Sequence, residues 1–68
     1  MKFKTELVEK YMAEHEISKA EFCLRCNITM RDLNKLLMHD FSLSSYRALD
    51  IAQLLGVALN ELIGYRKS

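Results

Sequence analysis

The sequence has 68 residues and a mass of 7.9 kDa, which fits one small domain. Half of the chain is apolar, 28% is charged and proline is absent, so the composition excludes a disordered tail. The formal net charge of +1 excludes a uniformly basic coat for nucleic acid or membranes, and it equally excludes an acidic tail. Two cysteines are too few for a disulfide framework, and no apolar run approaches the ~18 residues of a membrane span. We therefore expect a soluble, cytoplasmic domain spanning residues 1–68, with an ordered core of about 3–64.

Apolar residues near the N-terminus recur at the spacing of one helix face. This pattern predicts a helix of about three turns that ends near His15 and Glu16. The residues of its stripe are Phe3, Leu7, Val8, Tyr11 and Met12.

Two short helices are predicted next, at about 18–26 and 29–38. Ser18 stands three residues before Glu21, which is the spacing of a capping box, and Thr29 stands at the same distance before Asp32. Asn27 separates the two helices, and asparagine tolerates the left-handed backbone of a tight turn. The expected inward face of the first helix contains Phe22, Cys23 and Cys26, and the second helix carries Leu33, Leu36 and Leu37.

The second half of the chain predicts a loop and two further helices. The loop covers about 39–43, and either Ser42 or Ser44 can cap the fourth helix. Gly56 and Gly64 stand where helix C-termini favour a left-handed residue. The fourth helix carries Ala48, Ile51, Ala52 and Leu55 at the spacing of one helix face, and Leu59, Leu62 and Ile63 form a short fifth helix. No segment has the pattern of a strand, so the predicted fold is all-α.

Two capped helices joined by a short turn are typical of a helix-turn-helix. Residues 51–64 (IAQLLGVALNELIG) and 17–23 (ISKAEFC) carry a resemblance to the lambda-repressor-like, Cro or XRE-type regulators of bacteria and phages. The resemblance covers about residues 7–64. It implies a compact five-helix lambda-repressor-like DNA-binding domain whose helix-turn-helix consists of the second and third helices. It also implies that the protein is located at the bacterial nucleoid.

The resemblance also implies a DNA-reading surface. In such a motif the second helix enters the major groove. Arg31 can pair with guanine, Asn34 with adenine, and Met30 offers apolar contact to a thymine methyl group, while lysines hold phosphates. Residues 17–39 have a local charge of +2, whereas the rest of the chain sums to −1. The implied DNA-binding residues are Lys19, Thr29, Met30, Arg31, Asn34 and Lys35.

A repressor-like regulator of this class reads a palindromic operator as a homodimer. Apolar residues that are expected to converge at the C-terminal end are the interface candidates, namely Leu54, Leu59, Ile63 and Tyr65.

A competing hypothesis is a protein-interaction module of phage or mobile-element type. Met30, Leu37 and Met38 make one side of the third helix apolar, and the net charge is small, so this surface could bind another regulator protein instead of DNA.

The pair Cys23 and Cys26 has the CxxC spacing, and His15 and His39 could complete a zinc site. We favour the structural interpretation, in which both thiols are small core residues, because these spacings match no zinc module. We expect no metal, no cofactor and no membrane partner. We also expect no enzymatic activity, since the sequence has no glycine-rich phosphate loop and no supported catalytic triad.

Overall fold

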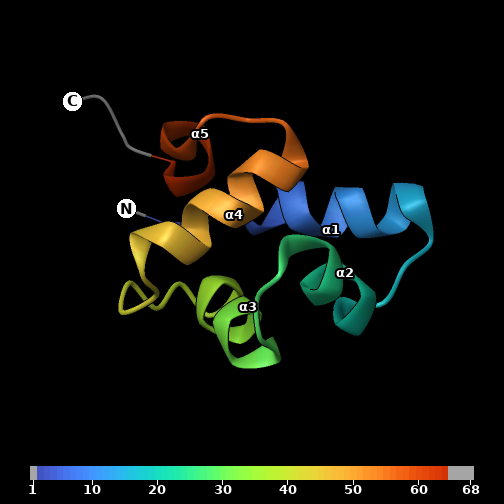
Figure 1. The fold of residues 1–68 in the computed structure, drawn as a ribbon. Coiled ribbons are helices and arrows are strands. Elements are labelled where there is room, and N and C mark those ends of the chain that lie inside the picture. Colours follow the sequence, from blue (N-terminus) through green and yellow to red (C-terminus); the bar gives the residue numbers. More distant parts are fainter. Residues whose placement is uncertain (1, 65–68) are drawn as a thin grey trace.

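The structure is a computed structural model that describes residues 2–64. All regular structure in this range is helical, which confirms the predicted all-α class with five helices. The helices, shown in Figure 1, are α1 (Thr5–His15), α2 (Lys19–Cys26), α3 (Met30–Leu37), α4 (Ser45–Leu55) and α5 (Leu59–Ile63). None of the five is long and apolar enough to cross a membrane.

Side-chain caps begin α2, α3 and α4. The Ser18 and Thr29 hydroxyls accept the backbone N–H groups of residues 21 and 32 at 3.2 and 3.1 Å, as predicted. Ser44 caps α4 by accepting the Arg47 N–H at 3.3 Å, which decides between the two serines proposed for this role. These caps satisfy amides that the first turn of a helix leaves without a partner.

The capping box is complete at α3 and half formed at α2. The Asp32 carboxylate accepts the Thr29 N–H at 3.1 Å, so both bonds of the box are present at α3. The Glu21 carboxylate instead lies 3.5 Å from Arg25 one turn along α2. The capping box predicted at Ser18 is therefore limited to its serine half.

Left-handed residues end several helices. Asn27, Gly56 and Gly64 have φ values of 59°, 75° and 61°, as their residue types predicted. At Gly64 a Cβ atom would also lie 3.0 Å from the Lys2 carbonyl oxygen, so this position favours glycine for space as well as for conformation.

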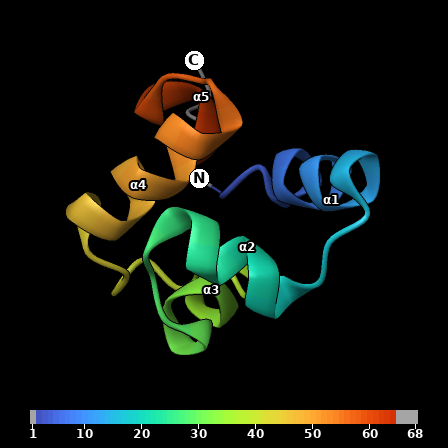
Figure 2. The ribbon, with the colours of Figure 1, turned by 45° about the vertical axis from the view of Figure 1, so that its right-hand side comes forward.

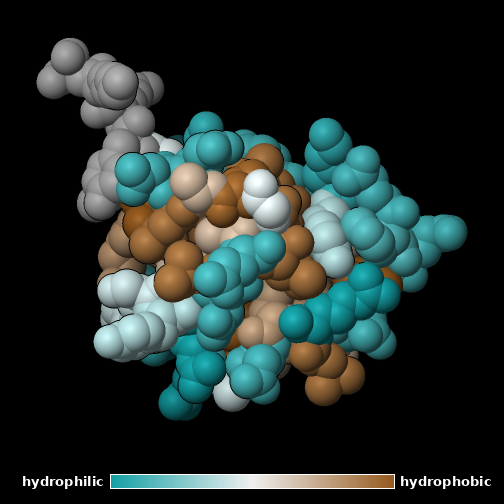
Figure 3. Space-filling view, turned by 45° about the horizontal axis from the view of Figure 1, so that its top comes forward, coloured by the Kyte–Doolittle hydropathy of each residue, from teal (hydrophilic) through white to brown (hydrophobic). Residues whose placement is uncertain are grey.

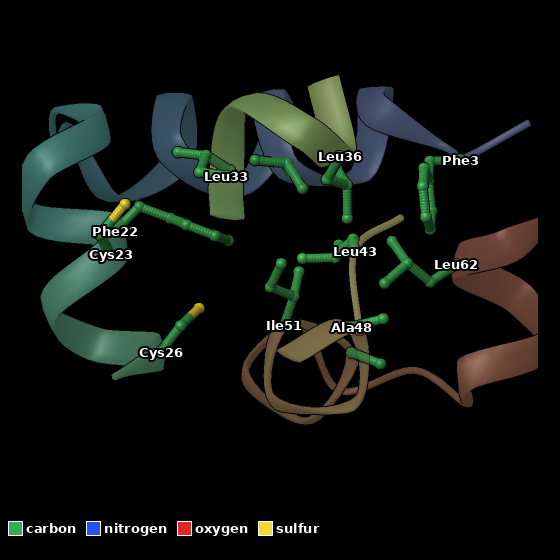
Figure 4. Close-up of a cluster of buried hydrophobic side chains, with 12 residues drawn as sticks. Phe3, Phe22, Cys23, Cys26, Leu33, Leu36, Leu43, Ala48, Ile51 and Leu62 are labelled. Atoms are coloured by element: carbon green, nitrogen blue, oxygen red, sulfur yellow. The ribbon is translucent and has the colours of Figure 1, made fainter. Parts of the chain in front are cut away.

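One buried cluster draws residues from every helix (Figure 4). Its twelve members are apolar, and no polar or charged residue of the described chain is buried. The largest fully buried side chains are Phe22, Leu33, Leu36, Ile51, Leu62 and Val8. At about 1.5–3 kcal/mol for each buried side chain of this size, the cluster is the main source of folding free energy.

The N-terminal segment corrects one prediction. Phe3 belongs to no helix, because α1 begins at Thr5. The segment instead runs beside α5, where the Lys4 N–H donates to the Leu62 carbonyl at 2.7 Å. The Phe3 N–H donates to His39 Nδ1 at 3.2 Å, and the Phe3 ring stacks on Phe41 with centroids 4.4 Å apart.

Two leucines also differ from their expected places. Leu43 lies in the segment predicted as a loop, yet its side chain is a buried member of the cluster. Leu37, expected to make the outer side of α3 apolar, is half-buried and packs against the cluster.

α4 packs against α1, α2 and α5, and α2 packs against α3. Both ribbon views place α5 and α3 at opposite ends of the molecule with α4 between them (Figures 1 and 2). One side of α3 buries Leu33 and Leu36 in the core, and the other side is exposed to solvent.

Candidate nucleic-acid interface

Residues 18–38, here called the α2–α3 unit, contain two short helices joined by residues 27–29. The left-handed Asn27 turns the chain, and the Ile28 N–H donates back to the Cys23 carbonyl at 3.0 Å. The Cys23 thiol then donates to the Thr29 carbonyl at 3.6 Å, which links α2 to the start of α3. Phe22 and Leu33 bury the inner sides of the two helices. The angle between α2 and α3 is thus fixed by packing and by local hydrogen bonds.

The structure brings five of the six predicted DNA-binding residues together at the start of α3. Met30, Arg31 and Asn34 are exposed and lie within the first two turns, while Thr29 is the exposed cap. Lys35 is half-buried. Lys19, the sixth residue, is exposed as the first residue of α2.

Arg47 of α4 also contacts this site, and its contacts are not predictable from the sequence. Its guanidinium donates through Nη1 to the Asn27 carbonyl at 3.3 Å. Its Nε lies 3.8 Å from an Asp32 carboxylate oxygen, and its Nη1 lies 3.8 Å from Asp50. The only local signal in the sequence is the spacing of Arg47 and Asp50, which places them on one side of a helix.

The Asp32 carboxylate is held in its ionised form. The backbone N–H of Thr29, first, and the nearby Arg47 and Lys35 charges lower the pKa of this carboxyl. The acidic residue in the first turn of α3 is therefore charged at neutral pH, and its charge is countered from within the protein.

Both cysteines are buried and free, which confirms their predicted place on the inner face of α2. Burial raises the pKa of the Cys26 thiol to about 12 and also raises that of Cys23. His15 instead lies at the end of α1, where its Nδ1 is 2.9 Å from the Tyr11 carbonyl, and His39 contacts Phe3. Within residues 2–64 the structure forms no group of three or more side chains suited to hold a metal ion.

Exposed apolar side chains occur on two parts of the described surface. On the α2–α3 unit, Leu24 and Met38 are 76% and 77% exposed, and Met30 is 41% exposed. Near the start of α4, Tyr46 is 82% exposed, with Phe41 and Leu49 exposed by about two fifths. We call this second set, which consists of Phe41 from the loop before α4 and of Tyr46 and Leu49 from α4 itself, the α4 apolar face.

The predicted dimer candidates Leu54, Leu59 and Ile63 are half-buried and pack against the core cluster. Tyr65, the fourth candidate, lies outside the described residues. Figure 3 shows the side of the molecule that carries α5, where apolar and polar side chains are interspersed. A shallow hollow of about 230 Å³ lies between α1 and the α4–α5 turn, lined by Leu7, Lys10, Tyr11, Glu14, Leu55 and Val57.

Comparison of the chain with protein-family models, with curated proteins and with solved structures finds no match.

Proposed function

We propose that the protein is a sequence-specific, repressor-like DNA-binding transcriptional regulator of lambda-repressor-like type. In this proposal α2 and α3 form a helix-turn-helix, and α3 lies in the major groove of double-stranded DNA. The observation that carries the proposal is the exposed start of α3, where Arg31 and Asn34 stand on a helix whose opposite side is buried.

Arg31 and Asn34 have the chemistry needed to read bases. A guanidinium donates two hydrogen bonds to guanine O6 and N7, and an asparagine amide pairs with adenine N6 and N7. Neither Arg31 nor Lys19 forms an ion pair with any described residue, so their charged groups are available to contact DNA. Thr29, Lys19 and Lys35 are assigned to sugar-phosphate contacts, and Met30 to a thymine methyl group.

The proposal also includes a homodimer, in which a second copy of the chain binds the same duplex. One short recognition helix contacts only a few base pairs, and a two-fold pair of domains reads two half-sites about one helical turn apart. We therefore expect two protein chains to bind each palindromic duplex.

The proposal is tested by selecting duplexes from random or genomic fragments at low salt, and then measuring affinity for the selected duplex against salt. We expect binding that falls steeply with salt, with two chains per duplex. Arg31→Ala should weaken binding by about 1–3 kcal/mol and relax the preference at one base pair of each half-site.

Lys10→Ala is the matched control, because it also removes one positive charge but lies on α1 beside the hollow formed with the α4–α5 turn. It should leave base preference unchanged and reduce affinity less than Arg31→Ala does. Failure of the wild-type protein to select any duplex at low salt contradicts the proposal.

The exposure of Met38 favours one alternative, a module that binds another regulator protein through the α2–α3 unit. Met38→Glu is the informative substitution, because Leu37 packs against the core and its replacement by glutamate would also destabilise the fold. A regulator partner that binds wild-type protein and is lost in Met38→Glu, together with no duplex binding, would replace the DNA proposal by this one.

A further inference from the structure

We infer that Arg47, which lies on α4 outside the α2–α3 unit, makes the first turn of α3 compatible with DNA by countering the charge of Asp32. This inference rests on the proposed function and assigns Arg47 as a positioning residue, not as a residue that touches DNA.

The geometry places Arg47 at the junction of three elements. One guanidinium contacts the Asn27 carbonyl at the end of α2, the Asp32 carboxylate in the first turn of α3, and Asp50 on its own helix. A single side chain thus connects α4 to both helices of the unit.

Asp32 stabilises the start of α3, which explains why a charged residue occupies the first turn of this helix. Its carboxylate completes the capping box by accepting the Thr29 N–H, and a carboxylate there also suits the positive end of the helix. The same turn carries Arg31 and Met30, which the proposed function directs toward DNA. An uncompensated carboxylate at this place would repel the phosphates that flank the groove.

The positive charge of the Arg47 guanidinium offsets the negative charge of Asp32. Only 18% of the Asp32 side chain is accessible to solvent, and the Arg47 guanidinium approaches it from α4. The two acidic residues of the α2–α3 unit are then both ion-paired, since Glu21 pairs with Arg25.

The test is a double-mutant cycle on the full chain, with Arg47→Gln, Asp32→Asn and the combined variant. The amide that Asp32→Asn introduces keeps an oxygen that can accept the Thr29 N–H, so the capping box survives in the variants. If Arg47 acts through Asp32, Arg47→Gln should weaken binding to the selected duplex by about three- to tenfold at low salt. Adding Asp32→Asn should restore the affinity to within about twofold of wild type, because the repelling charge is gone.

Two outcomes of the cycle overturn the inference. If the combined variant binds as weakly as Arg47→Gln and the salt slope falls by about one, Arg47 contacts a phosphate directly. If the weakening follows a loss of folding measured by urea denaturation in the same variants, Arg47 is only a stabilising residue.

Arg25→Gln is the matched control. It removes an arginine from the other ion pair of the unit, whose carboxylate belongs to Glu21 on α2 and not to α3. A rescue of Arg25→Gln by Asp32→Asn would mean that net charge alone is responsible, and it too would overturn the inference.

A measurement without DNA separates this inference from the proposed function. The ionisation of Asp32, followed by NMR of its carboxyl carbon, should shift to a higher pKa in Arg47→Gln. An unchanged Asp32 pKa overturns the inference even if the protein binds DNA. A shifted pKa in a protein that selects no duplex supports the Arg47–Asp32 link and overturns the proposed function.

Discussion

Cys23 and Cys26 show how burial decides the chemistry of a residue type. A CxxC pair serves redox or metal chemistry when its thiolates are accessible, because the thiolate is both the nucleophile and the metal ligand. Here both side chains are almost completely buried on the inner face of α2, and the thiol of Cys23 donates to the Thr29 carbonyl. The pair serves to fill space between α2 and its neighbours.

We predict that both thiols resist alkylation in the native protein. With a pKa of about 12, about one Cys26 thiol in ten thousand is ionised at pH 8. Iodoacetamide at pH 8, followed by mass spectrometry, should modify the folded chain more than tenfold more slowly than the same chain in urea. Equal rates in the two states would contradict the assignment of these cysteines to the core.

At the scale of the elements, side-chain caps determine where α2, α3 and α4 begin. Ser18, Thr29 and Ser44 each cap a helix, whereas the residues that precede α1 and α5, Lys4 and Ala58, form no side-chain cap bond. The complete capping box belongs to α3, the helix with the exposed candidate residues.

We predict that Thr29→Ala lowers the free energy of unfolding by about 1 kcal/mol, since it removes the acceptor for the Asp32 N–H. Ala58→Ser is the converse substitution, because it offers a cap to α5 and should raise stability by up to about 1 kcal/mol. Urea denaturation at pH 7 measures both. Equal stability of Thr29→Ala and wild type would contradict the role of the box.

The acidic half of the box gives this stabilisation a pH dependence. The folded-state pKa of Asp32 lies below its ordinary value of 3.8, so the contribution is complete above that value. It is lost as the pH falls from 3.8 through the lower folded-state pKa. The stability difference between wild type and Asp32→Asn should therefore stay constant from neutrality down to about pH 3.8 and shrink below it. A difference that stays constant through the acidic range would contradict an ionised Asp32.

The sequence predicts local features well because their causes are local. Apolar spacing and capping residues act within one or two turns, which is why the five helices and the caps at Thr29 and Gly56 are foreseeable. Phe3 was misplaced because its environment comes from His39 and Phe41, which are far away in the sequence. Arg47 was missed for the same reason, since its partner Asn27 lies 20 residues earlier.

At the scale of the whole molecule, a net charge of +1 hides an uneven surface. The basic excess lies in the segment of α2 and α3, and the structure pairs both acidic residues of that segment with arginines. The α4 apolar face of Phe41, Tyr46 and Leu49 provides a different kind of surface. The proposed DNA binding uses the basic surface of α2 and α3. A protein partner would instead contact the α4 apolar face or Met38.

An NMR titration of the labelled protein with its selected duplex, following every backbone amide, separates these two surfaces. We predict that the largest shifts fall at Lys19 and at residues 29–35, with the amides of the α4 apolar face changing little. Shifts centred on Phe41, Tyr46 and Leu49, or the absence of shifts with any duplex at low salt, would contradict DNA binding through α3.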